Sequence, residues 1–261
     1  MQAKVIALCN QKGGVGKTTT AVNLAACLAE VQKRVLIVDV DPQGNSTSGL
    51  GFDKSTLEQT SYDILVRGVH PTSVRLNTEI PSLDLIPSNL NLTGAEIELV
   101  SEVGREFKLK RALDEEIREQ YDYILVDCPP SLGLITVNAL SAADGVLIPV
   151  QCEYYALEGL SQLLKTLEEV RLYLNKDLDI TGVVLTMADF RTNLTTQVID
   201  EARQFFGDRV YSTVIPRSVR LSEAPSFGKP IILYDSASLG AQRYRALAQE
   251  FLGTGKESTV V

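Results

Sequence analysis

The run Asn10-Gln-Lys-Gly-Gly-Val-Gly-Lys-Thr-Thr-Thr20 has the residue types needed to bind a chain of phosphates. It follows an apolar segment, Lys4-Val-Ile-Ala-Leu-Cys9, and precedes an alanine-rich helical pattern from Ala21 to Ala29. In a strand, loop and helix of this kind, backbone N–H groups and the helix N-terminus point toward a bound anion. The stretch therefore predicts a phosphate-binding loop.

The loop departs from the ordinary phosphate-loop pattern, which is a glycine, four residues and then Gly-Lys-Ser/Thr. Gly16-Lys17-Thr18 matches the end of that pattern, but Gln11 stands where the first glycine is expected. Lys12 adds a second cation to the loop. A glycine-rich turn with no ligand is the alternative, and the Gly-Lys-Thr-Thr sequence argues against it.

Each residue type in the loop has a role in binding a nucleotide. The glycines let the backbone turn its amides toward an anion, because glycine tolerates positive φ and has no Cβ. Lys17 can place its ammonium on the β- and γ-phosphates, and the Thr18 hydroxyl can ligate Mg²⁺. Thr19 offers its amide and hydroxyl to the α-phosphate. The predicted contacts of the loop are Gly13, Gly14, Val15, Gly16, Lys17, Thr18 and Thr19.

Two later strand-like runs end in carboxylates. Asp127-Cys-Pro-Pro-Ser131 follows Tyr-Ile-Leu-Val, where P-loop enzymes place the Walker B aspartate of the Mg²⁺ shell. Asp39-Val-Asp41-Pro-Gln-Gly-Asn45 follows Val-Leu-Ile-Val, and one carboxylate of this pair can orient a water toward the γ-phosphate. An aspartate at a strand end is ordinarily a cap or turn residue. With a phosphate loop on the neighbouring strand, we favour catalysis for Asp41 and metal-shell roles for Asp127 and Asp39.

Short aliphatic runs alternate with helical patterns along the chain. The runs are continuous rather than alternating, as is typical of strands covered by helices on both faces. Besides the first run they span 35–39, 123–127, 146–150 and 183–186, with weaker candidates at 83–86 and 214–215. The helical patterns span 18–31, 106–119, 157–174, 195–206 and 239–252. The alternation predicts an α/β fold with a doubly wound, mostly parallel sheet of the P-loop NTPase type and sites at the carboxyl ends of its strands.

We expect a single domain over residues 1–252 and a flexible polar tail over 253–261. Residues 52–100 are an irregular elaboration of that domain, with helical signal only at 62–66 and 94–100. The only histidine, His70, lies there without an Asp, Ser or Cys pattern that would support catalysis, so we interpret it as a loop residue.

Composition limits the classes of function. With 261 residues, of which 44% are hydrophobic, the chain can bury a large core. Its formal charge of −8 is unusual for a nucleic-acid binder, so any DNA contact needs a local basic patch. The four cysteines have no C-x-x-C spacing and are expected to be reduced and mostly buried. We expect no signal peptide and no membrane span.

With these motifs the chain resembles the ParA/MinD family of ATPases, whose phosphate loop is a deviant Walker A motif. The resemblance extends through four further segments, which stand at Asp39-Val-Asp-Pro-Gln-Gly-Asn45, Asp127-Cys-Pro-Pro-Ser-Leu-Gly133, Pro149-Val-Gln-Cys-Glu-Tyr-Tyr155 and Ile215-Pro-Arg-Ser-Val-Arg-Leu-Ser-Glu-Ala-Pro225. Together they cover nearly the whole chain and are most similar to the short chromosomal ParA proteins of the Soj branch.

The resemblance implies a switch driven by Mg²⁺ and ATP. In the family two subunits sandwich two ATP molecules, and the additional lysine, here Lys12, reaches the nucleotide of the opposite subunit. Lys12, Lys17 and Asp41 would then be the catalytic residues, with Asp41 positioning the water. Pro216 would border the adenine. Relatives often have asparagine at the position of Ser218, which puts a side-chain contact from that residue to the base in question.

The same resemblance implies non-specific binding of double-stranded DNA by the ATP-bound homodimer. A ParB-like centromere-binding partner would stimulate hydrolysis that is slow without it, and the protein would be cytoplasmic and nucleoid-associated. Arg191, Arg217 and Arg220 are the candidates for DNA phosphate contacts. From Arg209 to Arg220 there are three arginines and no acids. The alternative is that these arginines pair with nearby carboxylates.

Two other classes of protein remain as alternatives. A MinD-like, membrane-associated positioning ATPase would need a basic amphipathic C-terminal helix, whereas Lys256 is the only basic residue in 253–261. A metabolic or redox enzyme, such as the nitrogenase iron protein or dethiobiotin synthetase, could use the same loop. Cys128 lies in a suitable loop for a shared cluster, but the sequence places no second cysteine near it.

Overall fold

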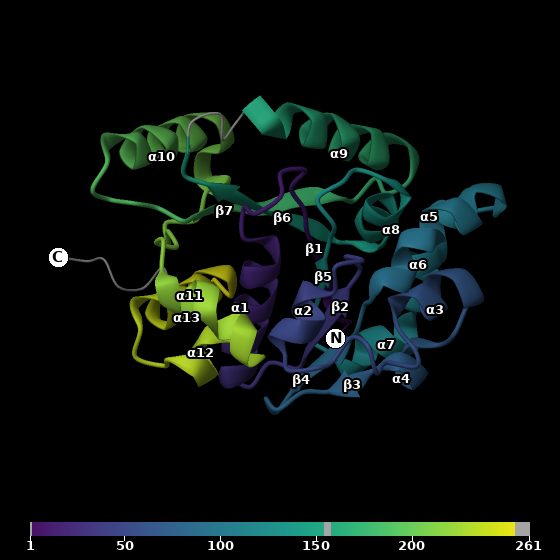
Figure 1. The fold of residues 1–261 in the computed structure, drawn as a ribbon. Helices are drawn as coiled ribbons and strands as arrows, with labels where there is room; N and C mark the ends of the chain where they lie inside the picture. The colour runs from purple at the N-terminus through teal and green to yellow at the C-terminus, as the bar shows by residue number, and fades with distance from the viewer. Residues whose placement is uncertain (1, 154–157, 254–261) are drawn as a thin grey trace.

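Seven strands form one sheet in the order β3-β4-β2-β5-β1-β6-β7 (Figure 1). This computed structural model describes residues 2–153 and 158–253. All neighbouring strands are parallel except β3, which pairs antiparallel with β4 at one edge. The strands are β1 (Lys4–Leu8), β2 (Val35–Asp39), β3 (Leu76–Asn77), β4 (Leu83–Ile86), β5 (Tyr123–Asp127), β6 (Gly145–Gln151) and β7 (Asp179–Thr186).

Helices cover both faces of the sheet. The α-helices are α1 (Lys17–Glu30), α2 (Asn45–Gly49), α3 (Ser61–Arg67), α4 (Pro71–Val74), α5 (Ala95–Glu98), α6 (Lys108–Ala112), α7 (Glu115–Gln120), α8 (Leu134–Ala142), α9 (Ser161–Tyr173), α10 (Asn193–Phe206), α11 (Val219–Glu223), α12 (Ile231–Tyr234) and α13 (Leu239–Phe251). Short 3₁₀ helices are η1 (Leu90–Gly94), η2 (Leu99–Ser101), η3 (Arg105–Phe107), η4 (Glu158–Leu160), η5 (Gly207–Arg209) and η6 (Ala224–Phe227). In Figure 1, α1 and α13 lie below the sheet, and α9 and α10 lie above it.

Two apolar clusters, one on each face, hold these layers together. The first joins the sheet to α1, α12 and α13, and the second joins it to α8, α9, α10 and the helices near α3 and α6. All five side chains of β2 are buried, which explains why its sequence does not alternate. The predicted α/β fold with a mostly parallel sheet is therefore confirmed.

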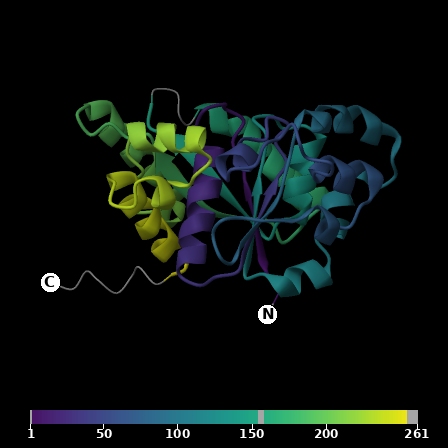
Figure 2. The ribbon, with the colours of Figure 1, turned by 60° about the horizontal axis from the view of Figure 1, so that its bottom comes forward.

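The register of the central strands brings the predicted site residues to one level. Leu8 at the end of β1 lies opposite Asp127 at the end of β5, and Asp39 at the end of β2 also lies opposite Asp127. Figure 2 shows the loops at these strand ends along one edge, with α11 on one side of them and the segment around α5 on the other. The sheet thus gathers segments that are far apart in the sequence.

Two predicted elements were wrong. Residues 214–215 form no strand: Ile215 donates a backbone hydrogen bond to Leu185, but Pro216, which has no N–H, follows directly. The predicted helix over 106–119 is interrupted between α6 and α7, because Asp114 accepts a hydrogen bond from the Ile117 amide and starts a new helix.

The elaboration over residues 52–100 adds β3, which the sequence did not indicate, and β4 to the edge of the same sheet. His70 caps α4 by accepting a hydrogen bond from Thr72, and its Nε2 lies 3.5 Å from Asp114. The predicted helix at 157–174 appears as η4 and α9, and residue 157 is outside the described part. Residues 254–261 of the predicted tail are also outside it, and the domain boundaries stay a prediction.

Candidate functional site

The loop between β1 and α1 borders a cavity of about 370 Å³. Gly14 and Gly16 have φ values of 76° and 88°, a left-handed conformation that favours glycine. Gly16 caps α1 with no side-chain hydrogen bond, so the N–H groups of the first turn face the cavity without a capping side chain. This is the geometry that a phosphate-binding loop requires.

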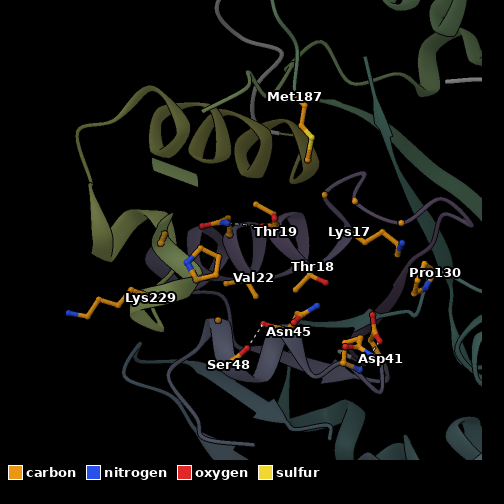
Figure 3. A pocket seen from close by; sticks show the side chains of 18 residues that line it. Lys17, Thr18, Thr19, Val22, Asp41, Asn45, Ser48, Pro130, Met187 and Lys229 are labelled. Atoms are coloured by element: carbon orange, nitrogen blue, oxygen red, sulfur yellow. Dashed lines mark hydrogen bonds between the residues drawn. The ribbon is translucent and has the colours of Figure 1, made fainter. Parts of the chain in front are cut away.

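Figure 3 shows the two ends of this cavity. Lys17, Asp41 and Pro130 gather at one end, Lys229 lies at the other, and Met187 lies to one side. A second cavity of about 260 Å³ adjoins the first and shares Gly16, Thr19, Met187 and Pro225 with it. The two together form an elongated site that extends from Lys17 and Asp41 to the segment around Pro216.

The two lysines of the loop lie differently. Lys17 is buried, and its Nζ donates a hydrogen bond to the Lys12 carbonyl oxygen at 3.1 Å. Burial lowers the pKa of Lys17, while the charge of Asp127 opposes that shift. Lys12 is 45% exposed, and its ammonium forms an ion pair with Glu153. One cation therefore points into the loop and the other away from it.

Asn10 fixes the start of the loop. Its Nδ2 donates to the Pro149 carbonyl oxygen at 2.7 Å, and its Oδ1 accepts from the Lys12 amide at 3.0 Å. On the other side, the Thr186 hydroxyl donates to the Val15 carbonyl oxygen at 2.8 Å. The ends of β6 and β7 thus hold the loop in position.

Helix α2 binds the two buried strand-end aspartates through consecutive hydroxyls. Ser46 Oγ donates to Asp127 Oδ2 at 2.8 Å, and Thr47 Oγ1 donates to Asp39 Oδ2 at 2.7 Å. The amides of Thr47 and Asp41 also donate to Asp39, at 2.9 and 3.2 Å. Sequence analysis did not identify Ser46 or Thr47, and the only signal was a polar Asn-Ser-Thr-Ser run after Gly44.

Burial raises the pKa of both aspartates. For Asp39 the charge of Asp127 adds to the effect, and the hydrogen bonds from Thr47 oppose it. For Asp127 the hydroxyls of Ser46 and Thr18 and the charge of Lys17 oppose the increase in pKa. Burial in one site therefore disfavours the charged form of both carboxylates, and the charge of Lys17 partly offsets this at Asp127.

Asp127 Oδ1 is buried and has no hydrogen-bond partner among the described residues. No group of three or more His, Cys, Asp or Glu side chains in residues 2–153 and 158–253 could hold a metal ion. The donor set beside the loop is thus one carboxylate oxygen and the Thr18 hydroxyl. Such a set suits Mg²⁺ that takes most of its ligands from phosphate and water, as Mg²⁺ usually does.

Asp41 is almost fully buried and lines the larger cavity. Its Oδ1 accepts a hydrogen bond from the Gln43 amide at 2.9 Å. Gly44 makes the turn that follows, with φ 59°. A Cβ at Gly44 would lie 2.6 Å from the Ser88 carbonyl oxygen, so only glycine fits there. This turn places Asp41 near the Lys17 end of the cavity.

Pro216 and Ser218 line the smaller cavity, together with Leu221 and Tyr244. The Tyr244 hydroxyl lies 3.3 Å from Thr20 Oγ1 on α1. The predicted base-side residues thus lie at the end of the site formed by the smaller cavity, which neither Lys17 nor Asp41 lines. Their roles stay predictions.

The three candidate arginines lie beside that end but differ in their partners. Arg191 binds Asp189 through two hydrogen bonds, of 2.8 and 2.5 Å, and holds the pKa of Asp189 at about 2. Arg220 lies 3.1 Å from Glu223 and 3.4 Å from Asp235. Arg217 is exposed and forms no ion pair with the described residues. The pairing alternative thus describes Arg191 and Arg220.

All four cysteines are free and buried, as expected. Sequence spacing indicates no cysteine suitably placed near Cys128, but the fold brings Cys9 Sγ to 3.2 Å from Cys128 Sγ. The pairing of β1 with β5 causes this proximity, which sequence spacing does not reveal. Both thiols belong to one chain, so the pair does not reproduce thiols shared across two subunits. Within the described residues, no helix has the length and apolar character to span a membrane.

Comparisons with known proteins show the family to which the chain is similar. An AAA domain family model matches residues 3–180. The sporulation initiation inhibitor protein Soj of Bacillus subtilis (strain 168) is 62% identical over 252 residues, covering 97% of this chain and 99% of Soj. The chromosome partitioning protein ParA of Myxococcus xanthus is 53% identical over 249 residues, covering 95% and 88%.

Among solved structures, cobyrinic acid a,c-diamide synthase from Mycobacterium smegmatis, with a bound ATP analog and magnesium, has a TM-score of 0.85. It is 36% identical and covers 98% of this chain and 97% of its own. The synthase is less similar in sequence to this chain than the two partition proteins are. The predicted family resemblance is confirmed. The chain belongs to the ParA/Soj family of chromosome-partitioning ATPases.

Proposed function

We propose that this chain is an ATP-dependent DNA-segregation switch, cytoplasmic and associated with the nucleoid. An ATP-bound homodimer binds double-stranded DNA without sequence preference, and a ParB-like partner stimulates hydrolysis and release. The observation that carries the proposal is the arrangement of the two loop lysines. Lys17 is buried over its own loop, and Lys12 points outward, where a nucleotide held by a second subunit would be within its reach.

The residues of the cavity suit a magnesium nucleotide. The loop amides and Lys17 would hold the phosphates, and Thr18 would ligate the metal, with Asp127 Oδ1 in its outer shell. The oxygens of Asp39 are taken by Thr47 and the Asp41 amide, which favours a positioning role for Asp39. When bound, Mg²⁺ neutralises part of the phosphate charge. The Mycobacterium smegmatis structure with its ATP analog and magnesium supports this assignment.

Hydrolysis requires a water in line with the bond between the γ-phosphorus and the β–γ bridging oxygen. Asp41 accepts a hydrogen bond from that water and orients it. The new bond to phosphorus forms as the bridging oxygen leaves with ADP. Lys17 and the partner subunit's equivalent of Lys12 stabilise the charge that develops on the phosphate oxygens. Without the second lysine, or without a partner to order the loop around Asp41, turnover is slow.

DNA binding by an acidic chain depends on a local basic surface that dimerisation doubles. Arg217 is exposed and lines the smaller cavity. Arg191 and Arg220 are also exposed, and all three arginines belong to the segments that follow β7. Few phosphates are neutralised by such a surface, yet affinity still falls as salt rises. Because these segments border the cavity, the bound nucleotide can influence them.

A DNA-binding assay with ATP, with ADP and without nucleotide tests the proposal. We expect several unrelated duplexes to bind with ATP alone, and to be released when a ParB-like protein from the same organism is added. Equal binding under all three conditions would overturn the nucleotide switch. Binding to anionic vesicles instead of DNA would favour the MinD-like alternative.

A further inference from the structure

The segment from Asp41 to Lys54 leaves the sheet after β2, forms α2 and then folds back toward its own start. Figure 3 shows Asp41, Asn45 and Ser48 of this segment along the lower side of the larger cavity. After α2 the Gly51 amide donates a hydrogen bond to the Ser48 carbonyl oxygen at 3.0 Å, which reverses the chain. The residues that follow α2 are therefore brought back toward the residues that precede it.

The segment starts with a tight turn over Asp41-Pro-Gln-Gly44, and Asp41 and Gln43 of this turn line the cavity. The Gly44 amide donates to the Asp41 carbonyl oxygen at 2.8 Å, and the Gln43 amide donates to Asp41 Oδ1 at 2.9 Å. Aspartate in the first position, proline in the second and glycine in the fourth are the residues that such a turn favours. The turn's own hydrogen bonds leave the Gln43 carbonyl oxygen open to a donor from outside the turn.

Lys54 supplies that donor. Its Nζ lies 2.6 Å from the Gln43 carbonyl oxygen, which is a short, charge-assisted hydrogen bond. Its aliphatic stem lies over Gly44, because a Cβ built on Gly44 would come to 2.5 Å from Lys54 Cδ. Lys54 therefore joins the end of the segment to the turn at its start.

The charge of Lys54 is directed to this turn alone. Lys54 is the only lysine, arginine or histidine between Arg34 and Arg67, a stretch that contains five carboxylates. Yet Lys54, which is half-buried, forms no ion pair with the residues that the structure describes. Its ammonium thus binds the backbone of the turn instead of a carboxylate.

We propose that Lys54 is a positioning residue for ATP hydrolysis, which clamps the turn at Gln43 and thereby fixes the direction of the Asp41 carboxylate. Lys54 lines neither of the two cavities described above, so it acts through the turn and not by contact with the nucleotide. The inference rests on the proposed function in one respect, the role of Asp41 in orienting the attacking water.

A clamp of this kind affects the rate of hydrolysis more than the affinity for nucleotide. The phosphate loop is held by hydrogen bonds that join Asn10 to Pro149 and Val15 to Thr186, none of which involves Lys54. The direction of Asp41 matters when the water attacks, and a small misplacement of a catalytic group costs a large part of the rate. Loss of the Lys54 ammonium should therefore lower kcat and leave KM nearly unchanged.

Lys54→Met tests the clamp, because methionine keeps an unbranched stem over Gly44 and has no ammonium. With ATP and Mg²⁺ at saturation, Lys54→Met should hydrolyse ATP about tenfold more slowly in a single turnover, and Lys54→Arg should recover most of the rate. Lys33→Met is the matched control: Lys33 is also half-buried, forms no ion pair with the described residues and precedes the opposite end of β2. A rate for Lys54→Met equal to that of the parent would overturn the inference.

Hydrogen exchange tests the clamp without relying on hydrolysis. The Gly44 amide, measured without nucleotide, should exchange faster in Lys54→Met than in the parent, and at the parent's rate in Lys54→Arg. Equal exchange in all three proteins would contradict a clamp on the turn. A slower rate of hydrolysis accompanied by an equal loss of ATP affinity would also contradict it, because Lys54 would then support the whole site instead of the direction of Asp41.

Asp41→Ala separates a failure of this inference from a failure of the proposed function. If Asp41→Ala hydrolyses ATP as fast as the parent, the role of Asp41 in the proposed function is wrong, and the exchange of the Gly44 amide still tests the clamp. If Asp41→Ala is slow while Lys54→Met keeps the full rate, the proposed function stands and the positioning role of Lys54 is overturned.

Discussion

The Lys12 ammonium forms an ion pair with Glu153, on the segment that follows β6, while the Lys12 carbonyl accepts a hydrogen bond from Lys17. The backbone of Lys12 is thus part of its own phosphate site, and its side chain is held outside that site. A lysine that acts on a nucleotide in another subunit would have to leave Glu153 first.

Substitutions at both ends of this ion pair should change ATP-dependent dimerisation in opposite directions. Lys12→Ala should abolish the dimer. Glu153→Gln frees Lys12 and should tighten the dimer by up to about fivefold, because an exposed ion pair contributes about 0–1 kcal/mol. Light scattering across a range of protein concentrations, with ATP, measures both. An unchanged dimer fraction in Lys12→Ala would count against a role in the opposite subunit.

Replacement of Asp41 should separate nucleotide binding from hydrolysis. Asp41→Ala is expected to bind ATP normally, to hydrolyse it at least about 100-fold more slowly, and to remain on DNA as a trapped dimer. Asp53→Ala, which removes an aspartate that does not line the cavity, is the matched control. Single-turnover phosphate release and a filter-binding assay give the two readouts. Rapid turnover by Asp41→Ala would remove Asp41 from the catalytic role.

The three arginines should contribute unequally to DNA binding. Arg217→Ala should weaken binding most, because Arg191 and Arg220 must first give up Asp189 and Glu223. Loss of one phosphate contact should lower the slope of log affinity against log salt by about one. Gel shifts at several salt concentrations, with Arg171→Ala on α9 as control, measure this. If no arginine variant loses affinity, the basic surface lies elsewhere.

The raised pKa of Asp39 makes stability depend on pH. A carboxyl whose pKa is raised in the folded state binds a proton that the unfolded chain has released, so its contribution to stability is complete below about pH 4 and is lost as pH increases. Asp39→Asn should therefore melt at a temperature that rises relative to the parent between pH 5 and pH 8. Calorimetry without nucleotide measures this, and a constant difference in melting temperature would contradict it.

Much of this site could be predicted from sequence, because its chemistry is local. Glycines and lysines in a loop between a strand and a helix, and aspartates directly after aliphatic runs, indicate the same kind of site in any α/β sheet. The Cys9–Cys128 contact could not be predicted, because it depends on β5 rather than β2 pairing with β1. Ser46 and Thr47 were missed because a helix of five polar and small residues has no apolar periodicity.

The interrupted helix at 106–119 shows a different limit. Leu109, Leu113 and Ile117 repeat every four residues and are all buried, so the apolar pattern continues across the break. The helical period alone therefore predicts one helix. Only the side chain of Asp114, which caps α7, indicates that a second helix begins.

Gly44 offers a test of the turn that positions Asp41. Gly44→Ala would put a methyl group against the Ser88 carbonyl in a left-handed conformation, and should destabilise the protein by about 1–3 kcal/mol. Gly68→Ala is the matched control, because Gly68 is also left-handed but lies in open space. It measures the loss of stability caused by the backbone conformation alone. Urea unfolding compares them. Equal losses in the two variants would show that contact with Ser88 has no effect.

Consecutive hydroxyls on α2 bind carboxylates that end two different strands, Ser46 on Asp127 and Thr47 on Asp39. If a ligand displaces α2, both buried carboxylates lose their donors in the same movement. Each lost donor leaves a buried carboxylate oxygen unpaired, which costs about 1–3 kcal/mol or more. Displacing α2 carries both costs together, so the position of α2 is linked to the two strand-end carboxylates at once.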